Sequence, residues 1–180
     1  LNRLLHRAFF VAKKIRTETG IGDRAVSISY AAVELSKKIF DTLEAKKVLM
    51  IGAGEMAELA VEHLLRNRIG KIFVANRTFE RGVTLAERFK GLAVRLEEIP
   101  ILLEQVDIII SSTGSTQLII QRDQVKAAMP ARRHRPLFFI DIAVPRDIDP
   151  EINRLNNAYL YNVDDLQNII DILASMGREG

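Results

Sequence analysis

From residue 46 onward, short continuous apolar runs alternate with segments whose apolar residues recur every three or four positions. The continuous runs predict strands buried on both faces, and the three-to-four spacing predicts helices that bury one side. We expect strands at 46–52, 71–75, 92–96, 107–112, 136–144 and 158–163. Helices are expected at 55–70, 79–91, 97–106 and 122–131, and a last one opening at Asp164. This alternation predicts an α/β fold with a doubly wound parallel sheet.

Helical patterns also flank this region. Leu1, Leu4, Leu5, Ala8, Ala12 and Ile15 fit one face of a helix, which the glycines of "TETGIGD" interrupt. A second helix is expected to start with Ser27 or Ser29 as its N-cap. Because the chain opens inside one helical pattern and stops inside another, we expect it to be a piece of a longer protein.

The first predicted strand runs into Gly52-Ala53-Gly54-Glu55-Met56-Ala57, which matches G-x-G-x-x-G/A. In a strand–turn–helix setting, Gly52 permits the tight turn, Gly54 lets a pyrophosphate approach the backbone, and Ala57 keeps the helix close to the sheet. The helix N-terminus then offers free N–H donors and a partial positive charge to the phosphates. We therefore interpret the turn as a dinucleotide site; a glycine turn kept for packing alone is the alternative.

The second predicted strand ends at Asn76-Arg77-Thr78, and Asn76 follows Gly52 by 24 residues. An acidic residue here would bind the ribose hydroxyls of NAD and repel a 2′-phosphate, whereas a guanidinium suits that phosphate. The stretch thus predicts NADP rather than NAD, unless Arg77 is a solvated surface residue. Arg81 is either a second phosphate contact or a solvent-facing helix residue.

Two later strands end at the same predicted edge. Ser112-Thr113-Gly114 follows the fourth strand, and Ala143 and Val144 close the fifth just before a proline. In a doubly wound sheet these carboxyl ends border the crevice beside the glycine turn. We expect them to contact the ribose and nicotinamide; a polar turn and a plain strand exit are the alternatives.

Composition narrows the function classes. The chain has 180 residues, 48% hydrophobic and 27% charged, with a net charge of +3. No cysteine is present, which removes disulfides, thiolate metal sites and a cysteine nucleophile, and the histidines (His6, His63, His134) are scattered, so no metal site is predicted. Without a membrane-length apolar run or a signal-peptide pattern, we expect a soluble cytoplasmic protein. The basic stretch 131–136 precedes the fifth strand, so it is either a solvated loop at the opposite edge or a contact for a polyanionic partner.

Taken in order, several stretches resemble the central region of glutamyl-tRNA reductase. They are "RTETGIG", "SYAAVELSKKIF", "VLMIGAGEMAELA", "VANRT", "IIISSTGS", "FFIDIAVPRDIDPEI" and "LYNVDDLQ". The resemblance covers nearly the whole chain; Ala57 departs from it, since the family usually has glycine there. It implies a linker-helix stub at 1–22, an NADP-binding Rossmann-type domain at 23–163 and the start of a spinal dimerisation helix at 164–180.

What the resemblance implies for function is NADPH-dependent reduction of glutamyl-tRNA to glutamate-1-semialdehyde in tetrapyrrole synthesis. The family's catalytic cysteine and its tRNA recognition lie in domains outside this chain, so we expect no catalytic residue here and NADPH binding without turnover. The cofactor roles fall on 52–57, 76–78, 112–114 and 143–144. A homodimer and a glutamate-1-semialdehyde aminomutase are the implied protein partners. The rival interpretations are a shikimate-dehydrogenase-like NADP oxidoreductase and a non-catalytic nucleotide-sensing or interaction module.

Overall fold

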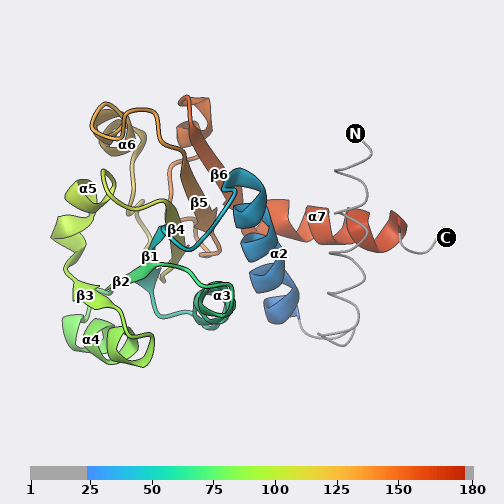
Figure 1. Ribbon diagram of the computed structural model, residues 1–180, viewed down its shortest axis with the longest axis horizontal. Helices are drawn as coiled ribbons and strands as arrows, with labels where there is room; N and C mark the ends of the chain where they lie inside the picture. The colour runs from blue at the N-terminus through green and yellow to red at the C-terminus, as the bar shows by residue number, and fades with distance from the viewer. Residues whose placement is uncertain (1–23, 177–180) are drawn as a thin grey trace.

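The computed structural model describes residues 24–176, and these form one six-stranded, fully parallel sheet (Figure 1). The strand order is β3-β2-β1-β4-β5-β6. The strands are β1 (Lys47–Gly52), β2 (Lys71–Ala75), β3 (Leu92–Val94), β4 (Ile108–Ser112), β5 (Leu137–Asp141) and β6 (Ala158–Asn162). The doubly wound α/β prediction is confirmed, and each of the six strands lies within one of the predicted apolar runs, although β3 and β5 are shorter than predicted. The helical pattern expected within 1–19 lies outside the described residues.

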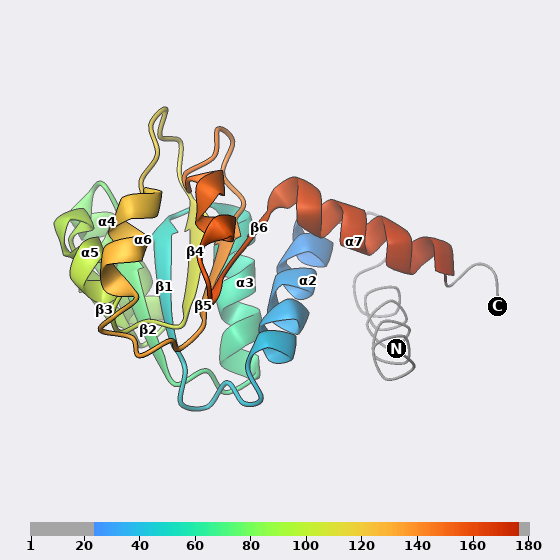
Figure 2. The same ribbon diagram turned by 90° about the horizontal axis from the view of Figure 1, so that it is seen from above.

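Helices cover both faces of the sheet (Figure 2). One face carries α2 (Arg24–Ile39), α3 (Glu55–Arg66), α4 (Phe79–Arg88) and α7 (Val163–Met176); the other carries α5 (Ile99–Leu102), α6 (Arg122–Ala128) and the 3-10 turn η2 (Pro150–Arg154). Strand residues alternate between the two cores, since Val48 and Met50 pack on the α3 side while Leu49 and Ile51 pack on the α5 side. Both faces of the sheet are therefore buried, which explains why the strand sequences are continuous apolar runs.

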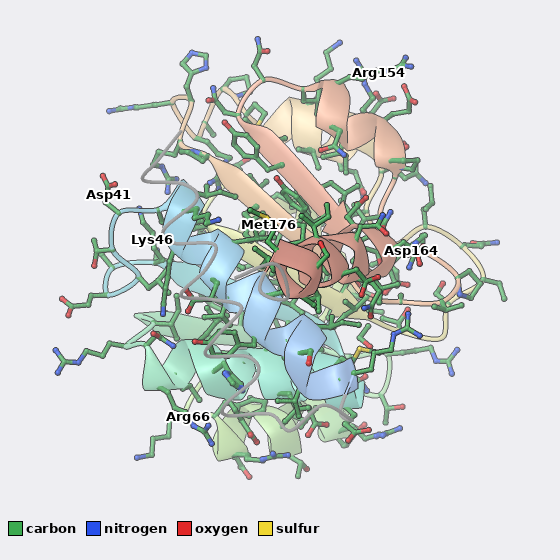
Figure 3. The ribbon with its side chains drawn as sticks, turned by 90° about the vertical axis from the view of Figure 1, so that its right-hand side faces the viewer. Asp41, Lys46, Arg66, Arg154, Asp164 and Met176 are labelled. Atoms are coloured by element: carbon green, nitrogen blue, oxygen red, sulfur yellow. The ribbon has the colours of Figure 1, made fainter. Side chains whose placement is uncertain are left out.

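The start of α2 differs from the prediction. The helix is already formed at Arg24, so neither Ser27 nor Ser29 caps it. Ser29 is buried inside the helix, and its hydroxyl donates to the carbonyl oxygens of Ala25, at 2.5 Å, and of Met56 in α3, at 3.2 Å. This serine therefore joins α2 to α3 instead of beginning a helix. Figure 3 looks onto α2, the outer layer of this face.

Helix ends were also misplaced. Glycines at 70 and 91 were expected to close two helices, but α3 ends at Arg66 and α4 at Arg88. The left-handed residues that follow are Arg68, with φ 62°, and Lys90, with φ 54°. A helix pattern marks the apolar face well, but its last turn is set by the backbone path back to the sheet, which the pattern does not encode.

Three further boundaries moved. The expected helix at 97–106 is a short 3-10 turn, η1 (Leu96–Glu98), followed by α5. The last helix is capped by Asn162, whose Oδ1 accepts the N–H groups of Asp164 and Asp165, and not by Asp164 itself. Strand β5 ends at Asp141, so the stretch 142–144 belongs to a loop. Among residues 24–176, none of the helices combines the length and the apolar character that a membrane crossing requires.

Candidate functional site

The glycine turn lies where β1 runs into α3, at the carboxyl edge of the sheet. Gly52 has φ 88° and pairs in register with Ser112, the last residue of β4. A Cβ at Gly52 would lie 2.3 Å from the Ser112 carbonyl oxygen, so both the backbone angle and the space require glycine. Within the described residues, no side chain caps the first N–H groups of α3, whose N-cap is Gly54. These donors remain available to an anion.

Gly54 is needed for a reason that the motif did not reveal. A Cβ built there would lie 1.9 Å from the Ser112 hydroxyl oxygen and 2.8 Å from its Cβ. The close packing of the β4 end on the turn therefore requires this glycine before any ligand is present. The packing explanation that the sequence left as an alternative therefore holds for Gly54, and the role of the turn in binding a phosphate stays a prediction.

Residues 76–78 follow the end of β2 and lead into α4, with Arg77 and Thr78 exposed. The Asn76 side-chain amide donates to the Thr78 carbonyl oxygen at 2.8 Å, which holds the turn in shape. Arg77 is exposed, and no side chain within 24–176 pairs with it. Arg81 is also exposed. Beside them, at the end of β3, the Arg95 guanidinium lies 4.4 Å from the centre of the Phe79 ring. Three arginines, at positions 77, 81 and 95, are therefore exposed near this end of β2.

Two loops stand beyond the carboxyl edge, one after β4 and one after β5 (Figure 2). The buried side chain of Asp147 joins them. It accepts the Ser111 hydroxyl at 2.6 Å, the Thr113 N–H at 2.9 Å and the Thr113 hydroxyl at 2.5 Å. The N–H and O–H donors of Thr113 are thus engaged within the protein, whereas Gly114 is exposed and a Cβ there would meet nothing within 4 Å.

The loop after β5 folds around a second buried carboxylate, Asp141. It accepts the N–H groups of Ala143 at 3.1 Å, Asp147 at 3.0 Å and Ile148 at 3.0 Å. These bonds turn the chain out of the sheet and explain why β5 is shorter than expected. They also engage the N–H of Ala143, which is buried, while Val144 is 79% exposed. Of the two predicted residues here, only Val144 presents an open backbone and side chain.

Burial raises the pKa of the Asp141 carboxyl, a shift that the neighbouring charge of Asp147 reinforces and the three backbone N–H donors oppose. Among the described residues no cation forms an ion pair with either carboxylate. Within the described residues, backbone N–H and hydroxyl groups are the donors to the carboxylates of Asp141 and Asp147. Sequence reasoning named neither Asp141 nor Asp147 as functional. The available signal was an acidic residue directly after the buried run "FFI" and a second one after the following proline.

Arg146 ties the same loop to α7. Its guanidinium donates to the Ala143 carbonyl oxygen at 2.9 Å and pairs with Asp164, which Figure 3 labels in the first turn of α7. Val163 and Leu166, also in that turn, are buried in the main core. The beginning of α7 is thus part of the folded unit that carries the loop.

The basic stretch 131–136 lies at the opposite edge and is not simply solvated. Arg132 is fully buried and donates to the carbonyl oxygens of Leu103, Val106, Arg135 and Pro136. Burial lowers its pKa to about 10, helped by the charge of Arg135 and opposed by Asp107, so Arg132 stays protonated at neutral pH. Arg133 and His134 are exposed. The expectation of a solvated loop is therefore wrong for Arg132, which closes the amino-terminal edge.

The predicted site residues thus fall into one edge of the sheet. The glycine turn, the end of β4 and the loop after β5 adjoin through paired strands, and the end of β2 lies on the other side of β1. Among residues 24–176, no side chain pairs with the first N–H groups of α3 or with Arg77, and these groups together suit a ligand with separated phosphates.

Comparison with known proteins shows which family this chain belongs to. The family model described as shikimate/quinate 5-dehydrogenase matches residues 34–169. A glutamyl-tRNA reductase of Desulfatibacillum aliphaticivorans is 65% identical over 171 residues, which are 95% of this chain and 39% of that protein. The chain therefore spans about two fifths of that relative's length.

Solved structures of glutamyl-tRNA reductases are similar to this chain in fold. Glutamyl-tRNA reductase from Methanopyrus kandleri superposes with a TM-score of 0.79 at 36% identity, over 98% of this chain and 44% of that one. The nucleotide-binding domain of the Thermoplasma volcanium enzyme has a TM-score of 0.66 at 23% identity, over 85% of this chain and 97% of that one, and shows the fold alone. The chain belongs to the shikimate/quinate 5-dehydrogenase family, has a Rossmann-type fold, and is similar over nearly its whole length to part of glutamyl-tRNA reductases.

Proposed function

We propose that this chain binds NADPH as the cofactor domain of a glutamyl-tRNA reductase. The observation that carries the proposal is Arg77, an exposed guanidinium without a partner among residues 24–176 at the end of β2, one strand away from the uncapped start of α3. A phosphate dianion on the adenosine ribose would give Arg77 the bidentate partner that it lacks. An NAD-binding edge would present a carboxylate at this place.

The remaining roles follow from position along the edge. The turn at 52–57 holds the pyrophosphate, and 76–78 hold the phosphorylated ribose. Residues 112–114 and 143–144 line the side on which the nicotinamide would lie. When bound, NADPH supplies a hydride. The chain's own residues bind and orient the cofactor, and none is assigned as nucleophile or general acid.

The whole protein would reduce glutamyl-tRNA to glutamate-1-semialdehyde, the step that begins five-carbon tetrapyrrole synthesis. That reaction needs a cysteine to hold the glutamyl group as a thioester, and this chain contains none. The chain by itself is therefore expected to bind NADPH without turnover. We place the tRNA contacts in other domains, the dimer contacts beyond 164, the domain boundary near 23, and the protein in the cytoplasm, where the aminomutase would receive the aldehyde.

Two rivals make different predictions. A shikimate-dehydrogenase-like enzyme is favoured by the description of the family model, and it requires the full-length protein to oxidise shikimate. The 65% identity to a glutamyl-tRNA reductase favours our proposal over it. If the chain is an interaction module that binds no dinucleotide, its melting temperature should not change when NADPH is added.

Thermal unfolding of this chain with increasing NADPH tests the proposal. A ligand at a hundred times its Kd adds about 2.7 kcal/mol to the free energy of unfolding, so the melting temperature should rise with NADPH concentration. NADH at equal concentration is the control and should raise it less. A melting temperature that stays constant up to millimolar NADPH would contradict the proposal and favour the interaction module.

A further inference from the structure

We infer that Asp147 is a positioning residue that holds the loops after β4 and β5 as one wall for the nicotinamide half of the cofactor. This inference rests on the proposed binding of NADPH. Asp147 is fully buried, so it does not touch a ligand itself. It lies in the loop after β5, whereas Ser111 lies in β4 and Thr113 in the loop after it, more than thirty residues earlier along the chain. Figure 2 shows these two loops side by side beyond the sheet.

The side chain of Asp147 makes the first set of ties. Its two oxygens accept three donors from β4 and the loop behind it, at 2.5 to 2.9 Å. Hydrogen bonds that a carboxylate accepts are stronger than those between neutral groups. Because two of the three donors belong to Thr113, the backbone that leads to Gly114 is fixed directly.

The backbone of Asp147 makes a second set. Its carbonyl oxygen accepts the N–H groups of Ile119, at 2.6 Å, and Ile120, at 3.1 Å, which return the β4 loop toward α6. Its own N–H donates to Asp141 at the end of β5. Asp147 thus contacts both ends of the loop after β4, at Thr113 and at Ile119 and Ile120. It also contacts Asp141, the last residue of β5, from which the second loop starts.

The consequence concerns only one half of the site. The loops joined by Asp147 lie at the ends of β4 and β5, while Arg77 lies at the end of β2, on the far side of β1. Loosening the Asp147 ties should therefore weaken contacts to the nicotinamide and its ribose. Contacts to the adenosine 2′-phosphate should persist. A residue that merely supported the fold would affect both halves equally.

The test compares two ligands, NADPH and 2′,5′-ADP, which carries only the adenosine half with its extra phosphate. Asp147→Asn should weaken NADPH binding by about tenfold or more, since an amide nitrogen that accepts no hydrogen bond replaces one of the two oxygens that accept from Ser111 and Thr113, and should change 2′,5′-ADP binding less than about twofold. Equal losses for the two ligands, or no loss of NADPH affinity, would overturn the inference. A wild-type chain that binds neither ligand would instead overturn the proposed function and this inference with it.

A milder variant keeps the test usable if Asp147→Asn unfolds the chain. Ser111 is fully buried and away from solvent, so Ser111→Ala removes one tie to Asp147 without removing a ligand contact. We expect NADPH binding to fall by about two- to tenfold with 2′,5′-ADP unchanged. Ser36→Ala is the matched control, because Ser36 is equally buried and its hydroxyl, among the described residues, donates only to the Ala32 carbonyl oxygen within α2. Equal behaviour of the two serine variants would also refute the role of Asp147.

Discussion

At the amino-terminal edge of the sheet the buried Asp107 lies beside buried Arg132, with the charged groups 3.8 Å apart, whereas at the carboxyl-terminal edge Asp141 and Asp147 are buried beside each other. Asp107 also accepts the backbone N–H of Lys47, and Arg132 satisfies four carbonyl oxygens. At the carboxyl edge only neutral donors reach the two carboxylates within 24–176. The amino-terminal edge thus contains a buried cation that bonds within the protein, whereas at the carboxyl-terminal edge Arg77 is exposed and pairs with no side chain of the described residues.

This difference separates the polar groups that maintain the fold from those that bind. A charge that already has buried partners gains little from a ligand and loses much when a partner is removed. An exposed charge without a partner contributes little to stability and much to recognition of an anion. The chain has 26 lysine and arginine residues, and burial rather than sequence clustering distinguishes their roles.

The largest expected effect is on the amino edge. Arg132→Met removes a buried cation, leaves several carbonyl oxygens unsatisfied and leaves Asp107 with one cation fewer. We expect the free energy of unfolding in urea to fall by about 3–5 kcal/mol. Arg133→Ala, an equal charge change at an exposed neighbour, should change it by less than about 0.5 kcal/mol. Similar small losses for both variants would mean that Arg132 does not hold this edge.

The next effect is on the carboxyl edge. Arg77→Ala should leave the unfolding free energy nearly unchanged, because the side chain has no partner among the described residues. It should weaken NADPH binding by about ten- to a hundredfold and leave NADH binding nearly untouched, as expected for loss of a charge-assisted bond to the 2′-phosphate. Arg133→Ala serves again as control, since it removes the same charge from the opposite edge. Equal losses for both cofactors would count against this assignment.

The smallest effect is a pH dependence. The folded-state pKa of Asp141 is raised above its ordinary value of 3.8, so the folded chain holds a proton that the unfolded chain has released. From pH 3.8 up to the raised pKa, stability contributed by this group therefore falls as pH increases. In Asp141→Asn this component is absent. Urea unfolding of both chains over that range should give different slopes against pH; parallel slopes would show that Asp141 is not shifted.

The sequence predicted the sheet because dry strands leave a visible apolar run, and it predicted the glycine turn because a tight turn leaves few alternatives to glycine. It missed Arg132, since a basic residue within a basic stretch looks the same whether it is solvated or buried under distant carbonyl oxygens. It missed Asp147 for a similar reason, because the three donors that it accepts come from residues 111 and 113. Whether a charged residue is buried and bonded depends on contacts between segments that are distant in the sequence. The spacing of apolar residues along the chain does not indicate these contacts.

The central claim is that the open arginine at the end of β2 recognises a phosphate on the adenosine ribose. The most direct measurement is calorimetric titration of this chain with 2′,5′-ADP and with AMP, which differ only in that phosphate. We expect 2′,5′-ADP to bind about tenfold or more tightly than AMP, and Arg77→Ala to remove most of the difference. Equal affinities in the wild-type chain, or a preference that survives the loss of Arg77, would contradict the claim.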